Sequence, residues 1–80
     1  MRPADLKLLL LIYWRFPDGV HADALVGMLG MQSKRVVLDR LLRLKELHLA
    51  DINGGCWSLT KTGLRWGDAA DDARQLLLEQ

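Results

Sequence analysis

The chain has 80 residues, of which 50% are hydrophobic, and its 11 Lys and Arg against 10 Asp and Glu give a net charge of +1. This length accommodates one small domain over residues 1–80, and the apolar content excludes a low-complexity disordered chain. The small net charge excludes non-specific binding driven by the field of the whole protein. The single cysteine, Cys56, excludes an internal disulfide and a multi-cysteine zinc site, and it suits a reducing, cytoplasmic setting.

A first helix is predicted over residues 3–16. Pro3 suits the first helical turn, and Asp5 favours the positive end of the helix dipole. The apolar run from Leu8 to Trp14 is far shorter than the roughly 20 residues that a membrane span needs, so no membrane partner is expected. The side chains that keep helical spacing are Leu6, Leu9 or Leu10, Tyr13 and Trp14.

A turn and a short helix come next. Pro17 ends the first helix and begins the turn, and Val20 is predicted to form a single-residue bridge or a very short strand. Residues 21–29 are predicted to form the second helix, which Gly30 ends. Its expected buried face consists of Ala22, Leu25, Val26 and Leu29.

A long helix predicted over residues 33–48 is the main functional lead. Ser33 can cap its start, because a serine oxygen accepts a hydrogen bond from an unpaired N–H of the first turn. The core stripe, at spacings of i, i+4 and i+7, is Val37, Leu41 and Leu44. At 100° per residue, the opposite side carries Gln32, Arg35, Asp39, Arg43 and Glu46, with Lys34 and Arg40 at its borders.

A hairpin is predicted over residues 50–59, around a tight turn at Asn53-Gly54-Gly55. Asn-Gly is favoured in two-residue turns because both positions tolerate positive φ. Its expected buried face consists of Ile52, Trp57 and Leu59.

The last predicted helix covers residues 61–78, and Thr60 can cap it. Gly63 and Gly67 weaken it intrinsically, so we expect them to permit close approach of another backbone, with a kink near Gly67 left open. Its expected buried stripe consists of Trp66, Ala70, Ala73 and Leu77.

This order of elements resembles a winged helix-turn-helix domain, a mainly α fold with a small β-hairpin. The resembling segments are GVHADALVGMLGM (19–31), the VxxxLxxLxxxxL spacing from Val37 to Leu49, and SLTKTGLRW (58–66). The last segment is similar to the L-T-x-x-G ending of the wing in bacterial regulators of the MarR, ArsR and PadR kinds. The resemblance covers residues 19–66.

The resemblance implies a small sequence-specific DNA-binding protein, a transcriptional regulator that uses the 33–48 helix as its recognition helix. An α-helix fits the major groove of double-stranded DNA, where Gln pairs with adenine, and Lys or Arg with guanine. Lys34 and Arg43 can also hold phosphates. The positions implied to contact DNA are Gln32, Ser33, Lys34, Arg35, Leu38, Asp39 and Arg43.

A homodimer on two half-sites is expected, because one recognition helix offers limited contact area. The first and last helices hold more apolar surface than a monomer of this size needs. The candidate dimer surfaces are Leu8, Leu11 and Ile12 on the first helix, and Leu76, Leu77 and Leu78 on the last.

Three departures from the family pattern bear on this interpretation. His48 stands where glycine is usual, so either the helix end differs or His48 adopts positive φ. The wing tip carries no Lys or Arg, and Asp39 and Glu46 place negative charge on the presumed DNA face. Together with the apolar Leu38 and Leu42, these features favour an alternative, a protein–protein interaction module that does not bind DNA.

No constellation supports an enzyme, a metal site or a cofactor. His21 and His48 have neither a cysteine partner nor paired ligand spacing, and Ser33 and Ser58 lack a base. Cys56 is expected to pack in a strand.

Two further groups of residues are assigned structural roles. The acidic side chains of the last helix are expected to form a solvated face, and the tryptophans are expected to be buried in the core rather than to stack on bases. These residues are Asp68, Asp71 and Asp72, and Trp14, Trp57 and Trp66.

Overall fold

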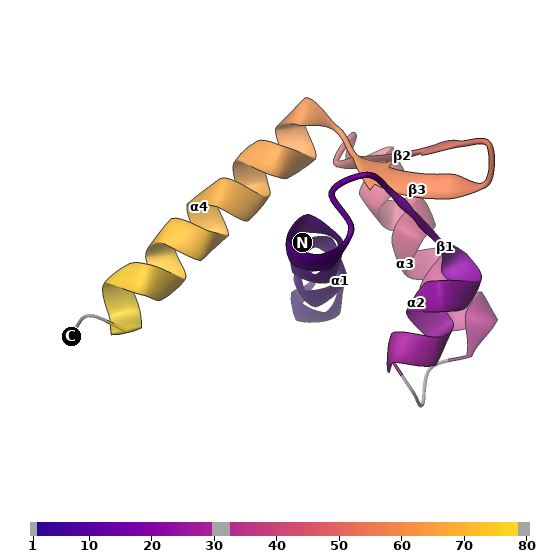
Figure 1. The fold of residues 1–80 in the computed structure, drawn as a ribbon, viewed down its shortest axis with the longest axis horizontal. Helices are drawn as coiled ribbons and strands as arrows, with labels where there is room; N and C mark the ends of the chain where they lie inside the picture. The colour runs from indigo at the N-terminus through magenta and orange to yellow at the C-terminus, as the bar shows by residue number, and fades with distance from the viewer. Residues whose placement is uncertain (1, 30–32, 79–80) are drawn as a thin grey trace.

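The computed structural model describes residues 2–29 and 33–78, without the side chains of Leu29 and of residues 75–78. The described chain is mainly helical, with four helices and a small antiparallel sheet (Figure 1). This confirms the predicted helix-rich class with a hairpin. The elements are α1 (Pro3–Arg15), β1 (Val20–His21), α2 (Ala22–Leu29), α3 (Lys34–Glu46), β2 (Ala50–Asn53), β3 (Cys56–Leu59) and α4 (Lys61–Leu78).

The sheet has the strand order β1-β3-β2, so the predicted bridge at Val20 is a third strand beside the hairpin. Asn53 pairs with Cys56, which makes Gly54 and Gly55 the central residues of the turn. Both have positive φ, 59° and 82°, as a two-residue hairpin turn requires. The turn lies within the predicted Asn53-Gly54-Gly55, but its two central residues are Gly54 and Gly55, and Asn53 is the last residue of β2.

The core lies between α1, α2, α3 and the sheet. Val37, Leu41 and Leu44 of α3 are fully buried, which confirms the predicted stripe. Ala22 and Leu25 of α2 are also buried, as predicted. The other large core side chains are Leu8, Leu9, Ile12, Val20, Leu49 and Trp57.

The predicted orientation of α1 was wrong. Its buried residues are Asp5, Leu8, Leu9 and Ile12, whereas Trp14 is 45% exposed. Leu8 and Ile12 therefore belong to the core and cannot form the predicted dimer surface, and Leu11 packs against the core. Because α1 is apolar almost all round, its spacing alone did not select the face that packs on α3.

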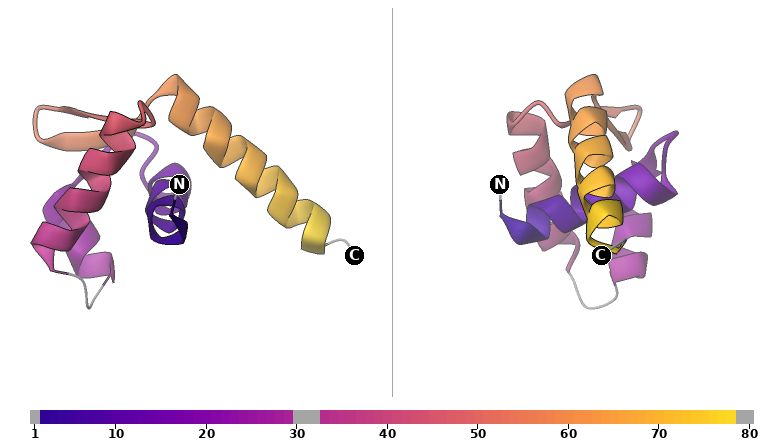
Figure 2. Two further views of the ribbon diagram at one scale, coloured as in Figure 1. Left: turned by 180° about the vertical axis from the view of Figure 1, so that it is seen from behind. Right: turned by 90° about the vertical axis from the view of Figure 1, so that its left-hand side faces the viewer.

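One flank of α4 packs against the rest of the chain, and its C-terminal end extends beyond the body (Figure 2). Gly63 and Gly67 are buried on this flank. A Cβ at Gly63 would lie 2.0 Å from the Leu49 carbonyl oxygen, and one at Gly67 would lie 2.3 Å from the Tyr13 ring. The predicted close approach of another backbone is confirmed at Gly63, whereas Gly67 lies against an aromatic side chain. The helix continues through Gly67 to Leu78.

The predicted stripe of α4 was wrong, since Trp66 is 49% exposed and Ala73 is exposed. The helix instead packs through its two glycines, which bring its backbone against Leu49 and Tyr13 and turn Trp66 outward. Leu76, Leu77 and Leu78 have side chains outside the described residues, so their predicted roles stay predictions.

The predicted face of the hairpin holds in part. Trp57 is buried on the central strand β3, and Leu59 is partly buried. Ile52 was predicted to be buried but is exposed, although it pairs with Trp57. Ile52 lies on the edge strand, next to the end of the hairpin, where fewer elements can cover it.

Replacing Gly63 with alanine is expected to destabilise the protein, although this change usually stabilises a helix interior by about 1 kcal/mol. The new Cβ would overlap the Leu49 carbonyl oxygen, so α4 must shift. We expect a loss of about 1–3 kcal/mol in the free energy of unfolding, measured by urea denaturation.

Gly27→Ala in α2 is the matched control, because a Cβ at Gly27 would meet nothing within 4 Å. This variant is expected to gain about 0.5–1 kcal/mol. Equal stability of the Gly63→Ala and Gly27→Ala proteins would contradict the close approach of α4 to Leu49.

Candidate nucleic-acid interface

Both ends of α3 are fixed by hydrogen bonds. At the start, the Ser33 Oγ accepts a hydrogen bond of 3.3 Å from the Val36 N–H, which confirms the predicted cap. At the end, His48 has a φ of 60°, the second of the two expected possibilities. The Leu49 N–H then donates to the Leu44 carbonyl oxygen at 2.8 Å. The helix predicted over residues 33–48 is observed as Lys34–Glu46.

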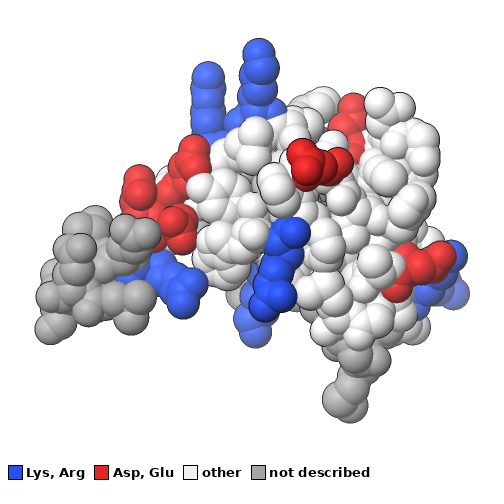
Figure 3. Space-filling view, viewed as in Figure 1, with Lys and Arg blue, Asp and Glu red and all other residues white. Residues whose placement is uncertain are grey.

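The exposed side of α3 carries most of the predicted DNA-contacting residues. Ser33, Lys34, Arg35 and Asp39 are exposed, and Leu38 packs partly against the core. Gln32 lies outside the described residues. On the face drawn in Figure 3, the Lys and Arg side chains stand at separate places rather than in one broad basic patch.

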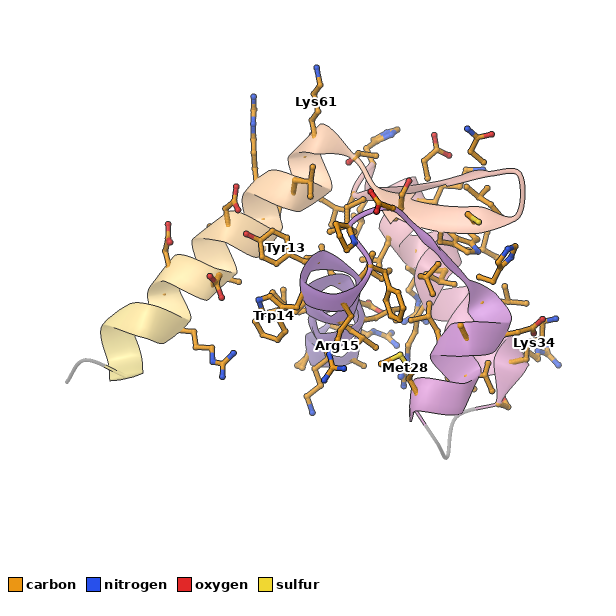
Figure 4. All side chains as sticks on the ribbon, viewed as in Figure 1. Tyr13, Trp14, Arg15, Met28, Lys34 and Lys61 are labelled. Atoms are coloured by element: carbon orange, nitrogen blue, oxygen red, sulfur yellow. The ribbon has the colours of Figure 1, made fainter. Side chains whose placement is uncertain are left out.

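Lys34 forms an ion pair with α2. Its Nζ lies 3.0 Å from the Asp23 Oδ1, and both side chains are well exposed. Figure 4 shows Lys34 projecting outward from the body, at the edge of the structure near α2. An exposed ion pair contributes little to stability, so Lys34 can exchange Asp23 for another anion at small cost. Arg35, the next residue, has no ion pair among the described residues.

Arg43 was predicted to contact phosphate, but the structure places it beside a buried carboxylate. Its Nη1 lies 4.0 Å from the Asp5 Oδ2, and the Asp5 side chain is only 3% exposed. The Asp5 Oδ1 has no hydrogen-bond partner among the described residues. A buried carboxylate needs a nearby cation, and Arg43 is the cation that the described structure supplies.

The structure therefore does not group Arg43 with Lys34 and Arg35. Eight residues separate Arg43 from Arg35, which is about 12 Å along a helix axis. The contact between Asp5 and α3 was not predicted from the sequence, because a favourable interaction with the helix dipole already accounted for an acidic residue in the first helical turn. The signal that could have found it is a carboxylate one turn before Leu8 and Leu9, on the most apolar part of α1.

Two aromatic residues of α1 hold α4. The Tyr13 hydroxyl donates to the Asp68 Oδ1, and the Trp14 Nε1–H donates to the Asp71 Oδ1 at 3.1 Å (Figure 4). The Arg74 guanidinium carbon lies 5.1 Å from the Trp14 ring centroid. Asp68 and Asp72 are exposed, as expected for a solvated face, whereas Asp71 is half-buried; Asp68 and Asp71 also accept these hydrogen bonds.

The same contacts change the acidity of Tyr13. The hydrogen bond to the Asp68 carboxylate, followed by desolvation and by nearby negative charge, raises the pKa of Tyr13 from 10.0 to about 12. The neutral phenol is therefore the form that joins α1 to α4.

Cys56 and His21 lie side by side on β3 and β1. The Cys56 Sγ is 3.4 Å from the His21 Nε2, so the prediction that His21 lacks a cysteine partner was wrong. The residues are cross-strand neighbours in the sheet, although 35 positions separate them in the sequence. In the described part of the chain, no group of three or more His, Cys, Asp or Glu residues is arranged to hold a metal ion.

No protein-family model matches the chain, and a search of curated proteins finds no match. None of the helices in residues 2–29 and 33–78 combines the length and the apolar character that a membrane crossing requires.

Replacing Arg43 with methionine is expected to lower the free energy of unfolding by about 1–3 kcal/mol, because the Asp5 carboxylate stays buried without a cation. Methionine keeps an apolar side chain at this position, so the charge is the main difference. Urea denaturation measures the loss.

The control is the same substitution in an Asp5→Asn background, where no buried charge remains. There the Arg43→Met change is expected to cost much less. An equal loss in both backgrounds would show that the Asp5–Arg43 pair does not stabilise the protein.

Tyr13 is expected to ionise near pH 12 in the folded protein rather than near pH 10. Since the pKa is raised on folding, the contribution of the neutral phenol to stability is complete below pH 10. It is lost as the pH rises from 10 to 12. Ultraviolet absorbance of tyrosinate measures this directly, because the chain has one tyrosine.

Asp68→Asn is expected to return the pKa of Tyr13 towards 10.0, whereas Asp72→Asn, which removes the weakest of the causes, should move it less. Circular dichroism at the same pH values establishes that each protein is folded. An ordinary tyrosine titration in the folded wild type would contradict the Tyr13–Asp68 hydrogen bond.

Proposed function

We propose that the chain is a winged helix-turn-helix domain and acts as a small sequence-specific DNA-binding protein, a transcriptional regulator in the cytoplasm. The order α1-β1-α2-α3-β2-β3-α4, with a β1-β3-β2 sheet, supports this class. The observation that carries the proposal is the N-terminal end of α3. Ser33, Lys34 and Arg35 are exposed there, while Val37, Leu41 and Leu44 fix the opposite side of the helix in the core.

In this proposal α3 enters the major groove by its N-terminal half. Arg35 has the geometry to form two hydrogen bonds with guanine, and Asp39, one turn further, can accept from the amino group of cytosine. Lys34 leaves Asp23 for a phosphate, which costs little because the pair is exposed. Arg43 lies beside the buried Asp5 but its side chain is 45% exposed, so we assign it a phosphate contact at most.

We further propose that two copies bind two half-sites, because one recognition helix offers a small contact area. Of the predicted dimer surfaces, the one on α1 is removed by the burial of Leu8 and Ile12. The C-terminal end of α4 extends beyond the body and is the surface that we assign to this contact (Figure 2).

The second candidate function is a protein–protein interaction module. Leu42 is 48% exposed on the side of α3 that also carries Asp39 and Glu46, and a phosphate backbone would meet both carboxylates. The turn of the hairpin consists of Gly54 and Gly55 and offers no cation. These features favour a protein partner over DNA.

Binding to a pool of random duplex DNA, at low and at moderate salt, tests the proposal. The wild type is expected to enrich particular sequences and to lose affinity steeply as salt rises, because phosphate contacts release counterions. A Lys34→Ala/Arg35→Ala double variant is expected to bind at least about tenfold more weakly.

A Lys61→Ala/Arg65→Ala variant is the matched control, since it removes the same charge from α4. It is expected to bind nearly as well as the wild type. Equal losses in both double variants would indicate attraction by net charge alone. Absence of DNA binding at low salt would favour the protein-interaction module.

A further inference from the structure

A shallow apolar recess lies between the C-terminal end of α3 and the first turns of α4. Its volume is about 150 Å³, and it is lined by Leu47, Leu49, Thr62 and Trp66. Leu47 is 50% exposed and Trp66 is 49% exposed, so two large apolar side chains stand at its border. A second hollow, lined by Arg65, Trp66 and Ala69, adjoins it across the Trp66 ring.

Hydrogen bonds and close packing fix the shape of this recess. The Thr60 Oγ1 donates to the His48 carbonyl oxygen at 2.6 Å, and the Thr60 N–H donates to the Leu49 carbonyl oxygen at 3.0 Å. Gly63 lies against the same Leu49 carbonyl. The first turn of α4 is therefore held against the end of α3. A preformed recess loses little conformational entropy when a partner binds.

The border of the recess is positively charged. Arg65 lines the adjoining hollow beside Trp66, and Lys61 lies one turn before Arg65 on α4; both side chains are exposed. Neither has an ion pair among the described residues. Figure 4 shows Lys61 pointing away from the body, and two basic side chains rise from the same end of the molecule in Figure 3.

Negative charge near the recess is limited. Glu46 is exposed beside Leu47, but about 100° around the helix from it. Asp68, the nearest acidic residue of α4, accepts the hydrogen bond from Tyr13 on the flank that packs against α1. Lys61 and Arg65 thus stand on the α4 side of an apolar centre.

We propose that this surface binds an acidic peptide segment of a partner protein, with one large apolar side chain placed in the recess. A volume of about 150 Å³ can hold a group of the size of benzene, which matches a Phe or Leu side chain. Glu and Asp residues beside this side chain would meet Lys61 and Arg65. Trp and Arg are also the residue types that dominate binding energy at protein interfaces.

The proposed peptide site is separate from the proposed DNA contact. Leu47 lies twelve residues beyond Arg35, about 18 Å along the helix axis. The two ligands can therefore bind together, and the peptide site does not depend on DNA binding.

The experiment uses a fluorescein-labelled synthetic peptide of Glu and Asp residues with one central Phe, and fluorescence polarisation at low and moderate salt. Saturable binding in the micromolar range is expected. Trp66→Ala and Lys61→Glu/Arg65→Glu are each expected to weaken it at least about tenfold, as is replacement of the peptide Phe by Ser. Lys7→Glu is the charge-reversal control on α1 and should bind as the wild type does.

Urea denaturation of each variant shows whether it is folded, so that a loss of binding can be assigned to the surface. The Lys34→Ala/Arg35→Ala variant should keep the peptide affinity, which separates this test from that of DNA binding. Absence of saturable binding by the folded wild type, or unchanged affinity in Lys61→Glu/Arg65→Glu, would overturn the proposal. Displacement of the labelled peptide by phenylacetate, as effective as displacement by unlabelled peptide, would also overturn the proposal, because the ligand of the recess would then be a small aromatic acid.

Discussion

The backbone of His48 and Leu49 is the joint on which the arrangement of this domain depends. The Leu49 N–H closes α3 through the Leu44 carbonyl, while the carbonyl groups of His48 and Leu49 accept hydrogen bonds from Thr60 at the start of α4. Ala50, the next residue, begins the edge strand β2. One residue with left-handed backbone, His48, therefore stands where α3 ends, the hairpin starts and the direction of α4 is set. Gly63 is required at this joint, because any side chain there would meet the Leu49 carbonyl.

Buried charge divides the basic residues of α3 into two groups with different physical roles. The Asp5 carboxylate is out of contact with water, so it keeps Arg43 at the α1 side of the helix. Lys34 has only an exposed partner, and its charge remains usable at the surface. Proximity on a helical wheel is thus a poor guide to function, because a neighbouring helix can engage one member of a basic cluster and leave another accessible.

Local rules predicted the parts of the fold that local chemistry determines. Ser33 as the cap of α3 and the core stripe of this helix each follow from side chains and their near neighbours in sequence. The exposure of Trp14 and Trp66 could not be predicted this way. Both depend on which flank of α4 meets α1, and two glycines, rather than the largest apolar residues, decide that contact. For the candidate site, the exposure of Lys34 and Arg35 was predictable, whereas the Asp5–Arg43 pair required the position of α1 on α3.

The packing of α4 through glycine has a consequence for the surface of the whole domain. A helix that buries tryptophan uses most of its apolar area in the core, whereas α4 approaches by its backbone and leaves Trp66 beside Leu47 at the surface. The free-energy cost of exposing this apolar area to water is removed when a partner covers it. Because α3 is a single rigid helix, its two ends then hold different chemistry at a fixed separation. The basic N-terminal end suits a phosphate-bearing ligand, and the C-terminal end, with α4, suits an apolar group among acidic ones.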